Sequence, residues 1–210
     1  MAGIIDNIKG DTEIKTDFES GDIYNGSITQ HDSALINTGN LTILADNNIG
    51  SITQPLQISL ESGSKLTAAS RNGNINIAAP GDKILINSVN TDYDSSIYLS
   101  ADGNIESSSF SAVNGGDITL VSEHGNIGSV ENSLKINAAG DLSAEAGYNI
   151  NIENISGDLR LLNAYSQAGD VKLTVLDGKI IDAVRNREID TEKQEELAAI
   201  WEKLHLTDDP

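Results

Sequence analysis

The chain has 210 residues, of which 38% are hydrophobic and only 4% aromatic, with 19 glycines and no cysteine. Its 32 acidic residues outnumber its 13 basic ones and give a formal net charge of −19. Because nucleic acids and anionic membranes are bound through patches of Lys and Arg, this charge excludes both as favoured partners.

The N-terminal stretch "MAGIIDNIKG" contains no apolar run long enough for a signal peptide, and nowhere does the chain offer the roughly 18 apolar residues of a membrane-spanning helix. We therefore expect either a protein that stays inside the cell or a segment whose export signal lies elsewhere. The missing cysteines suit a large secreted β protein but are weak evidence for one.

A short motif recurs along the chain: Gly, then Asp or Asn, then two apolar residues separated by a polar one. It occurs at residues 39–43, 73–77, 116–120, 157–161 and 169–173, with shorter versions at 21–23, 103–105, 125–127 and 140–142. Alternation with a period of two predicts strands with one buried face. The glycines and asparagines predict corners that need left-handed backbone.

A longer repeat contains these motifs. "GNLTILADNNIGS" at residues 39–51 returns as "GDITLVSEHGNIGS" at 116–129, and "NINI" occurs at 74–77 and again at 149–152. The chain is thus two copies of a block of about 76 residues, over about 39–115 and 116–183.

These short strands predict an all-β fold, a right-handed parallel β-helix over residues 1–183, with about 20 to 25 residues per coil and three or four coils per block. Equivalent strands pair one coil apart, their inward Ile, Leu and Val form ladders, and "NNIGS" is a recurring corner. An antiparallel sandwich or barrel is the alternative, but it does not account for the 76-residue repeat.

Residues 184–210 break the pattern, because "REIDTEKQEELAAIWEKLHLTDDP" has no glycine and is rich in Glu, Lys, Leu and Ala. Asp190 or Thr191 can cap a helix, and an apolar stripe at helical spacing follows. The stripe is Leu197, Ile200, Trp201 and Leu204. We expect an amphipathic helix that caps the solenoid; an interaction helix for a partner, between blocks of repeats, is the alternative.

Few residues have the spacing that a catalytic or metal site requires. His31, His124 and His205 occur in unrelated contexts, without metal-ligand or triad spacing, and are expected to be surface or turn residues. Asp46 and Glu123 match across the repeat, but we expect them to lie three or four coils apart, roughly 15 to 20 Å, and to form no common site.

The stretch "TDYDSS" with the following Asp102 is the strongest enzymatic candidate. Asp92 and Asp94 would share a face if they lay in a strand, and a glycosidase needs two carboxylates about 5 to 9 Å apart. An acidic, solvated loop is the favoured interpretation, and weak calcium binding remains open, although the calcium-binding nonapeptide pattern is missing. We predict no catalytic, cofactor-binding or metal-binding residues.

The strings "GNLTILADNNIGS…PLQI" and "GDITLVSEHGNIGS…SLKINAAGDLSAEAGYNINIENISGDLRL" resemble the repeat region of filamentous-haemagglutinin-like exoproteins, the large bacterial surface proteins of two-partner secretion, over about residues 20–183. The resemblance implies a β-helical shaft that passes through an outer-membrane transporter and serves attachment or biofilm formation at the cell surface. It implies no catalytic residue. An "NPNG"-like secretion-domain stretch and an identifiable toxic C-terminal domain were not found.

The expected function is therefore non-enzymatic: a structural and adhesive module that contacts an unidentified host-cell or matrix receptor or glycan, outside the cell. Two alternatives remain open at this stage. One is a β-helical polysaccharide lyase or hydrolase with a groove in the acidic segment 92–102. The other is a passive spacer without a ligand.

Overall fold

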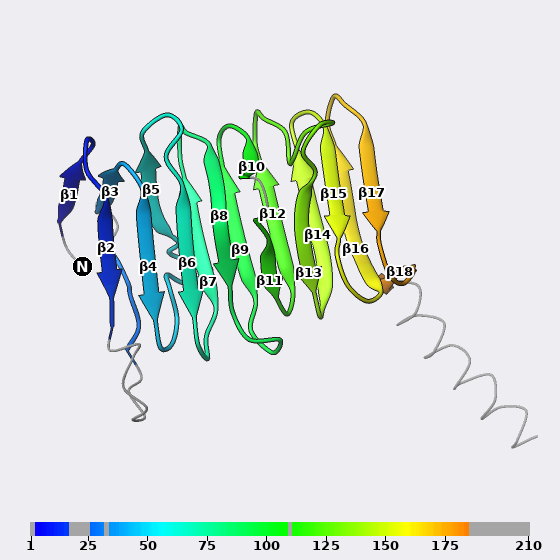
Figure 1. Cartoon of the computed structure of the whole chain (residues 1–210), viewed down its shortest axis with the longest axis horizontal. Helices are drawn as coiled ribbons and strands as arrows, with labels where there is room; N and C mark the ends of the chain where they lie inside the picture. The colour runs from blue at the N-terminus through cyan, green and yellow to red at the C-terminus, as the bar shows by residue number, and fades with distance from the viewer. Residues whose placement is uncertain (1–2, 17–25, 32–33, 109–110, 185–210) are drawn as a thin grey trace, which may run out of the picture.

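In the computed structural model, which describes residues 3–16, 26–31, 34–108 and 111–184, the chain winds into a solenoid of two parallel sheets. The strands lie side by side along the long axis of the molecule (Figure 1). The first sheet contains β1 (Ile4–Asn7), β3 (Leu35–Thr38), β5 (Leu56–Leu60), β7 (Ile75–Ala79), β9 (Ile97–Ala101), β12 (Ile118–Ser122), β14 (Asp141–Ala146), β16 (Leu159–Ser166) and β18 (Ile180–Asp182).

The second sheet contains β2 (Thr12–Lys15), β4 (Leu41–Ala45), β6 (Leu66–Ser70), β8 (Ile84–Asn90), β10 (Ile105–Ser107), β11 (Val113–Gly115), β13 (Leu134–Ala138), β15 (Ile150–Asn154) and β17 (Val171–Val175). The chain alternates between the sheets, so each strand pairs in parallel with the equivalent strand of the next coil. The predicted all-β parallel β-helix is confirmed. Among the described residues, no helix is long and apolar enough to span a membrane.

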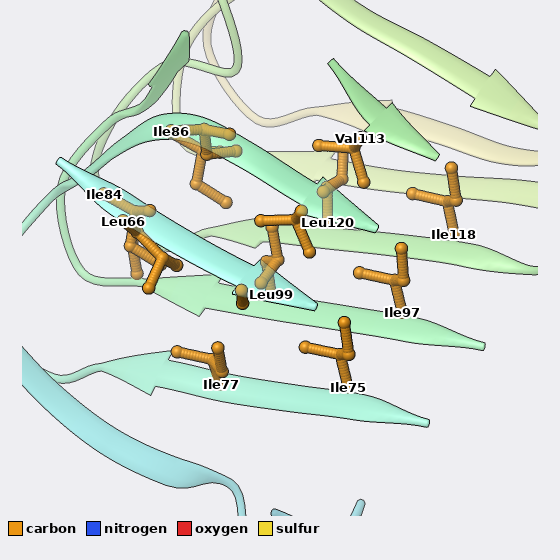
Figure 2. Packing of buried hydrophobic residues seen from close by; sticks show 14 of the residues in the cluster. Leu66, Ile75, Ile77, Ile84, Ile86, Ile97, Leu99, Val113, Ile118 and Leu120 are labelled. Atoms are coloured by element: carbon orange, nitrogen blue, oxygen red, sulfur yellow. The ribbon is translucent and has the colours of Figure 1, made fainter. Parts of the chain in front are cut away.

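Ladders of aliphatic side chains fill the space between the sheets. One ladder joins Ile75, Ile97 and Ile118, and Ile77, Leu99 and Leu120 form another; all six are at most 1% exposed. Figure 2 shows both ladders, with Leu66, Ile84 and Ile86 from the other sheet facing them. Because inward and outward residues alternate along each strand, the polar residues of the motif lie on the outer faces.

The Asn and Asp residues of the motif join one coil to the next. Asn126 accepts the backbone N–H of Asn149 on its Oδ1 at 3.0 Å, and its own N–H donates to Oδ1 of Asn104 at 2.8 Å. Asn149 in turn accepts the N–H of Asp170 at 2.9 Å. A side-chain oxygen at this position therefore binds a backbone donor at the coil edge that would otherwise need another partner.

The expected reason for the motif glycines is wrong for most of them. Gly73 and Gly125 do not have positive φ; instead, a Cβ at Gly73 would lie 2.6 Å from the backbone carbonyl carbon of Asn47, one coil earlier. A Cβ at Gly125 would collide with the backbone of Gly103 in the same way. Glycine is needed here because neighbouring coils approach too closely for any side chain.

The two sequence blocks lie on opposite sheets. The strand that begins the first block, β4, belongs to the second sheet, whereas its sequence equivalent β12 belongs to the first. The offset of 77 residues thus corresponds to three and a half coils, since consecutive ladder positions such as Ile75, Ile97 and Ile118 are 22 and 21 residues apart. Strand pairing continues across the junction at residues 115 and 116, because β12 pairs with both β9 and β14.

The predicted helix with the stripe Leu197, Ile200, Trp201 and Leu204 lies outside the described residues. The described chain ends just after β18, with Ala183 buried and Val184 exposed.

Candidate functional site

The acidic residues singled out in the sequence do not form one site. Asp92 and Asp94 lie in a turn before β9, not in a strand, and the Asp94 N–H donates to Oδ1 of Asp92 at 3.2 Å. Asp102 follows β9. A five-residue strand spans about 17 Å, well beyond the roughly 5 to 9.5 Å between the carboxylates of a glycosidase. The carboxylate groove suggested for residues 92–102 is therefore not formed by these residues.

Asp102 instead lies beside His124, one coil away. His124 Nδ1 is 2.7 Å from Asp102 Oδ1, and the His124 backbone N–H donates to the Asp102 carbonyl at 2.7 Å. Both side chains are substantially exposed, at 76% and 41%. The expectation that His124 is an exposed turn residue is correct, but its partner was missed.

Glu123 completes a cluster with this pair. One ligand atom from each of Asp102, Glu123 and His124 lies within 4.8 Å of the other two, and a carboxylate and an imidazole are ligands that zinc accepts. Ser122, two residues before His124, donates its hydroxyl to the Gly103 carbonyl at 2.9 Å. That serine is thus engaged in joining coils and is not presented to His124 as a nucleophile.

The sequence did contain the signal for the Asp102–His124 contact. "ADGNI" at 101–105 and "EHGNI" at 123–127 align with an offset of 22 residues, which is one coil. The 76-residue comparison concealed this shorter period. His31 is an exposed turn residue as expected, and His205 lies outside the described residues.

Asp46 and Glu123, equivalent in the repeat, have different surroundings. They follow strands of different sheets, β4 and β12. The Asp46 side chain is only 3% exposed, and its Oδ1 lies 3.4 Å from Arg71 Nη1 in the next coil, whereas the next-coil neighbour of Glu123 is Gly147. The two residues form no common site.

The corner "IGS" forms a distinct loop in both blocks. After Ile49 the chain leaves the sheet at Gly50, closes a turn through hydrogen bonds between Ser51 and Gln54, and rejoins the sheet at Leu56. In the second block, Ser129 and Asn132 make the corresponding hydrogen bond, before Leu134. We call residues 50–55 and 128–133 the corner loops.

Each corner loop presents an apolar residue at the same repeat position. Ile52 is 68% exposed and Val130 is 76% exposed. The loops lie at opposite edges of the solenoid, because one leads from the second sheet to the first and the other returns. Sequence reasoning identified the corner but not its exposed apolar tip, although the tip position is β-branched in both copies.

The first corner loop borders a groove of about 470 Å³ on the outer face of the first sheet. Ile52 lines this groove together with Tyr98 of β9, which is outward-facing between the buried Ile97 and Leu99. Asn74, Asp117 and Thr119 add polar groups to the lining. The arrangement places an aromatic ring and an aliphatic tip beside several hydrogen-bonding groups, as binding sites for small polar molecules do.

Comparison with protein-family models, with curated proteins and with solved structures found no match for this chain.

Proposed function

We propose that this chain is a structural and adhesive segment of a β-helical shaft. The observation that carries the proposal is the uninterrupted stacking of nine strands in each sheet. At about 4.8 Å per strand, the nine strands of the first sheet extend for about 38 Å. Such a stack is held together by identical local contacts at every coil, so it resists bending and presents its outer faces at regular intervals.

The adhesive part of the proposal is supported by the groove beside the first corner loop. Ile52 and Tyr98 offer apolar and aromatic contact, and Asn74 and Asp117 offer hydrogen-bonding groups, on a surface that does not contribute to the core. The contact partner would be a host-cell or matrix receptor or a glycan. The second corner loop, with Val130 at its tip, would give the opposite edge a related contact point.

The sequence resemblance supports the place of the segment in the cell. In this proposal the chain belongs to a filamentous-haemagglutinin-like exoprotein, crosses an outer-membrane transporter during two-partner secretion, and acts without catalysis at the bacterial surface. The separation of Asp92 and Asp94 from Asp102 favours this proposal over a glycosidase, because the carboxylate pair that motivated the enzymatic alternative is not assembled.

Adhesion and passive spacing are separated by a competition experiment. The purified chain is immobilised on beads, and attachment of host cells and of matrix-coated surfaces is measured with increasing amounts of the soluble chain. An adhesive segment supports attachment that the soluble chain inhibits. A passive spacer supports none, and that outcome would overturn the adhesive part of the proposal.

Two variants test whether the groove makes the contact. Ile52→Glu and Tyr98→Ala change groove residues with outward-facing side chains, so the stack should remain folded by circular dichroism. Both are expected to lower attachment at least fivefold. The matched control is Val130→Glu, which changes the equivalent loop tip on the opposite edge. An equal loss from all three would contradict a specific role for the first groove.

A further inference from the structure

The last coil of the solenoid leaves part of its first sheet uncovered. β16 continues to Ser166, but β18 pairs only with Leu159, Arg160 and Leu161. Among the described residues, no strand pairs with residues 162–166 on the side facing away from β14. The uncovered half-strand is the site of a groove of about 610 Å³.

Most residues that line this terminal groove are apolar. They are Leu161, Leu162, Ala164, Ile180 and Val184, with the polar Asn163 and Asp182. Leu162 is 44% exposed, Ile180 50% and Val184 41%. In earlier coils the residues stacked below Leu161, such as Leu142 and Ile118, are 0% exposed. The groove is therefore a place where the aliphatic ladders end without a following coil.

The second sheet ends in the same way. Leu173 of β17 is only partly buried, although Ile152 and Leu134, which precede it in its ladder, are 1% and 0% exposed. Leu176, just beyond β17, is 60% exposed. Exposed apolar surface of this kind at a sheet edge favours a covering segment, because otherwise it promotes association between edges.

We propose that residues 191–204 of this chain pack as an amphipathic helix into the terminal groove. The described chain ends at Val184, which itself lines the groove, so the following residues start at the site. Residues 185–190 can span up to about 20 Å. A helix of residues 191–204 would be about 21 Å long, comparable to the roughly 17 Å of a five-residue strand.

The sequence of this segment suits such a position. Leu197, Ile200, Trp201 and Leu204 recur at helical spacing, and a stripe of this kind faces the core in surface helices. The intervening Glu195, Glu196, Glu202 and Lys203 leave the opposite face charged. The proposed helix thus replaces the missing coil above the ladders while turning a charged surface to solvent.

Trp201 is the only tryptophan in the chain and reports on the proposal directly. In the full-length chain we expect its fluorescence to be blue-shifted and at least threefold less sensitive to acrylamide than in the urea-unfolded chain. Ile180→Glu and Leu162→Glu place a charge in the groove and should remove this protection. Both replace exposed side chains, and circular dichroism verifies that the sheets persist.

The matched control is Ile52→Glu, which places the same charge on an exposed apolar residue at the first corner loop. It should leave Trp201 protected. Protection that is equal in the control and the groove variants, or absent from the unmodified chain, would overturn the proposal. Protection that disappears on dilution, with dimers detected by light scattering, would also overturn it, since a second copy would then fill the groove.

Discussion

Gly50 and Gly128 occupy equivalent corners on opposite edges of the solenoid. Their φ angles are +62° and +67°, and a Cβ on either would collide with a backbone carbonyl oxygen of the next coil, that of Asn76 or of Asn151. The same added Cβ would also lie 2.7 Å from the N–H nitrogen where the chain rejoins the sheet, at Leu56 or Leu134.

Gly50→Ala and Gly128→Ala are therefore expected to destabilise the fold by similar amounts, more than about 3 kcal/mol each. The left-handed backbone costs a side chain about 1–2 kcal/mol, and the collision with backbone adds to this. Urea unfolding followed by circular dichroism measures both. Gly63→Ala is the control: φ there is +86° with open space around the added Cβ, so only the backbone cost of about 1–2 kcal/mol should remain.

The asparagine ladder predicts a second stability difference. Asn126→Ala removes the acceptor of the Asn149 N–H and a side-chain contact with Asn104, and should cost about 1–3 kcal/mol because a partly buried donor loses its partner. Asn126→Asp keeps that acceptor and should cost less. Asn87→Ala, which removes an exposed hydrogen bond to Thr67, should change the unfolding free energy by less than about 0.5 kcal/mol. An equal cost for Asn126 and Asn87 would contradict the role of the ladder.

The aliphatic ladders predict a gradient along the axis. Leu99→Ala removes a fully buried side chain from a central coil and should cost about 2–5 kcal/mol. Leu173→Ala changes the partly buried last rung of its ladder and should cost less than half as much. Chemical denaturation of both variants measures the ratio. A terminal cost as large as the central one would mean that the last coil is covered as tightly as the centre.

The Asp102–His124 pair should contribute little to stability despite its short distance. Both side chains are largely solvated, and exposed ion pairs typically contribute about 0.2–1 kcal/mol. A double-mutant cycle with Asp102→Ala and His124→Ala measures the coupling. A coupling above about 2 kcal/mol would show that the contact is structurally dominant at this edge.

The repeat and the alternation of apolar residues determine the fold class. Ile75, Ile77, Ile97 and Leu99 alternate with polar residues, and this pattern is compatible only with strands that bury one face. Local spacing also predicted that Asp46 and Glu123 share no site. The reason for most of the motif glycines was wrong, because local sequence shows a turn but not the backbone of the neighbouring coil, such as Asn47 beside Gly73.

By itself, then, the sequence determined a coiled stack of short parallel strands, since that information lies in the local period of the chain. Only the tertiary structure decided which residues meet across coils. The coil length varies by a few residues from turn to turn, and those small differences place β4 and β12 on opposite sheets, bring Asp102 to His124, and separate Asp92 and Asp94 from Asp102. Contacts of this kind depend on the accumulated register of the winding, which no short stretch of sequence contains.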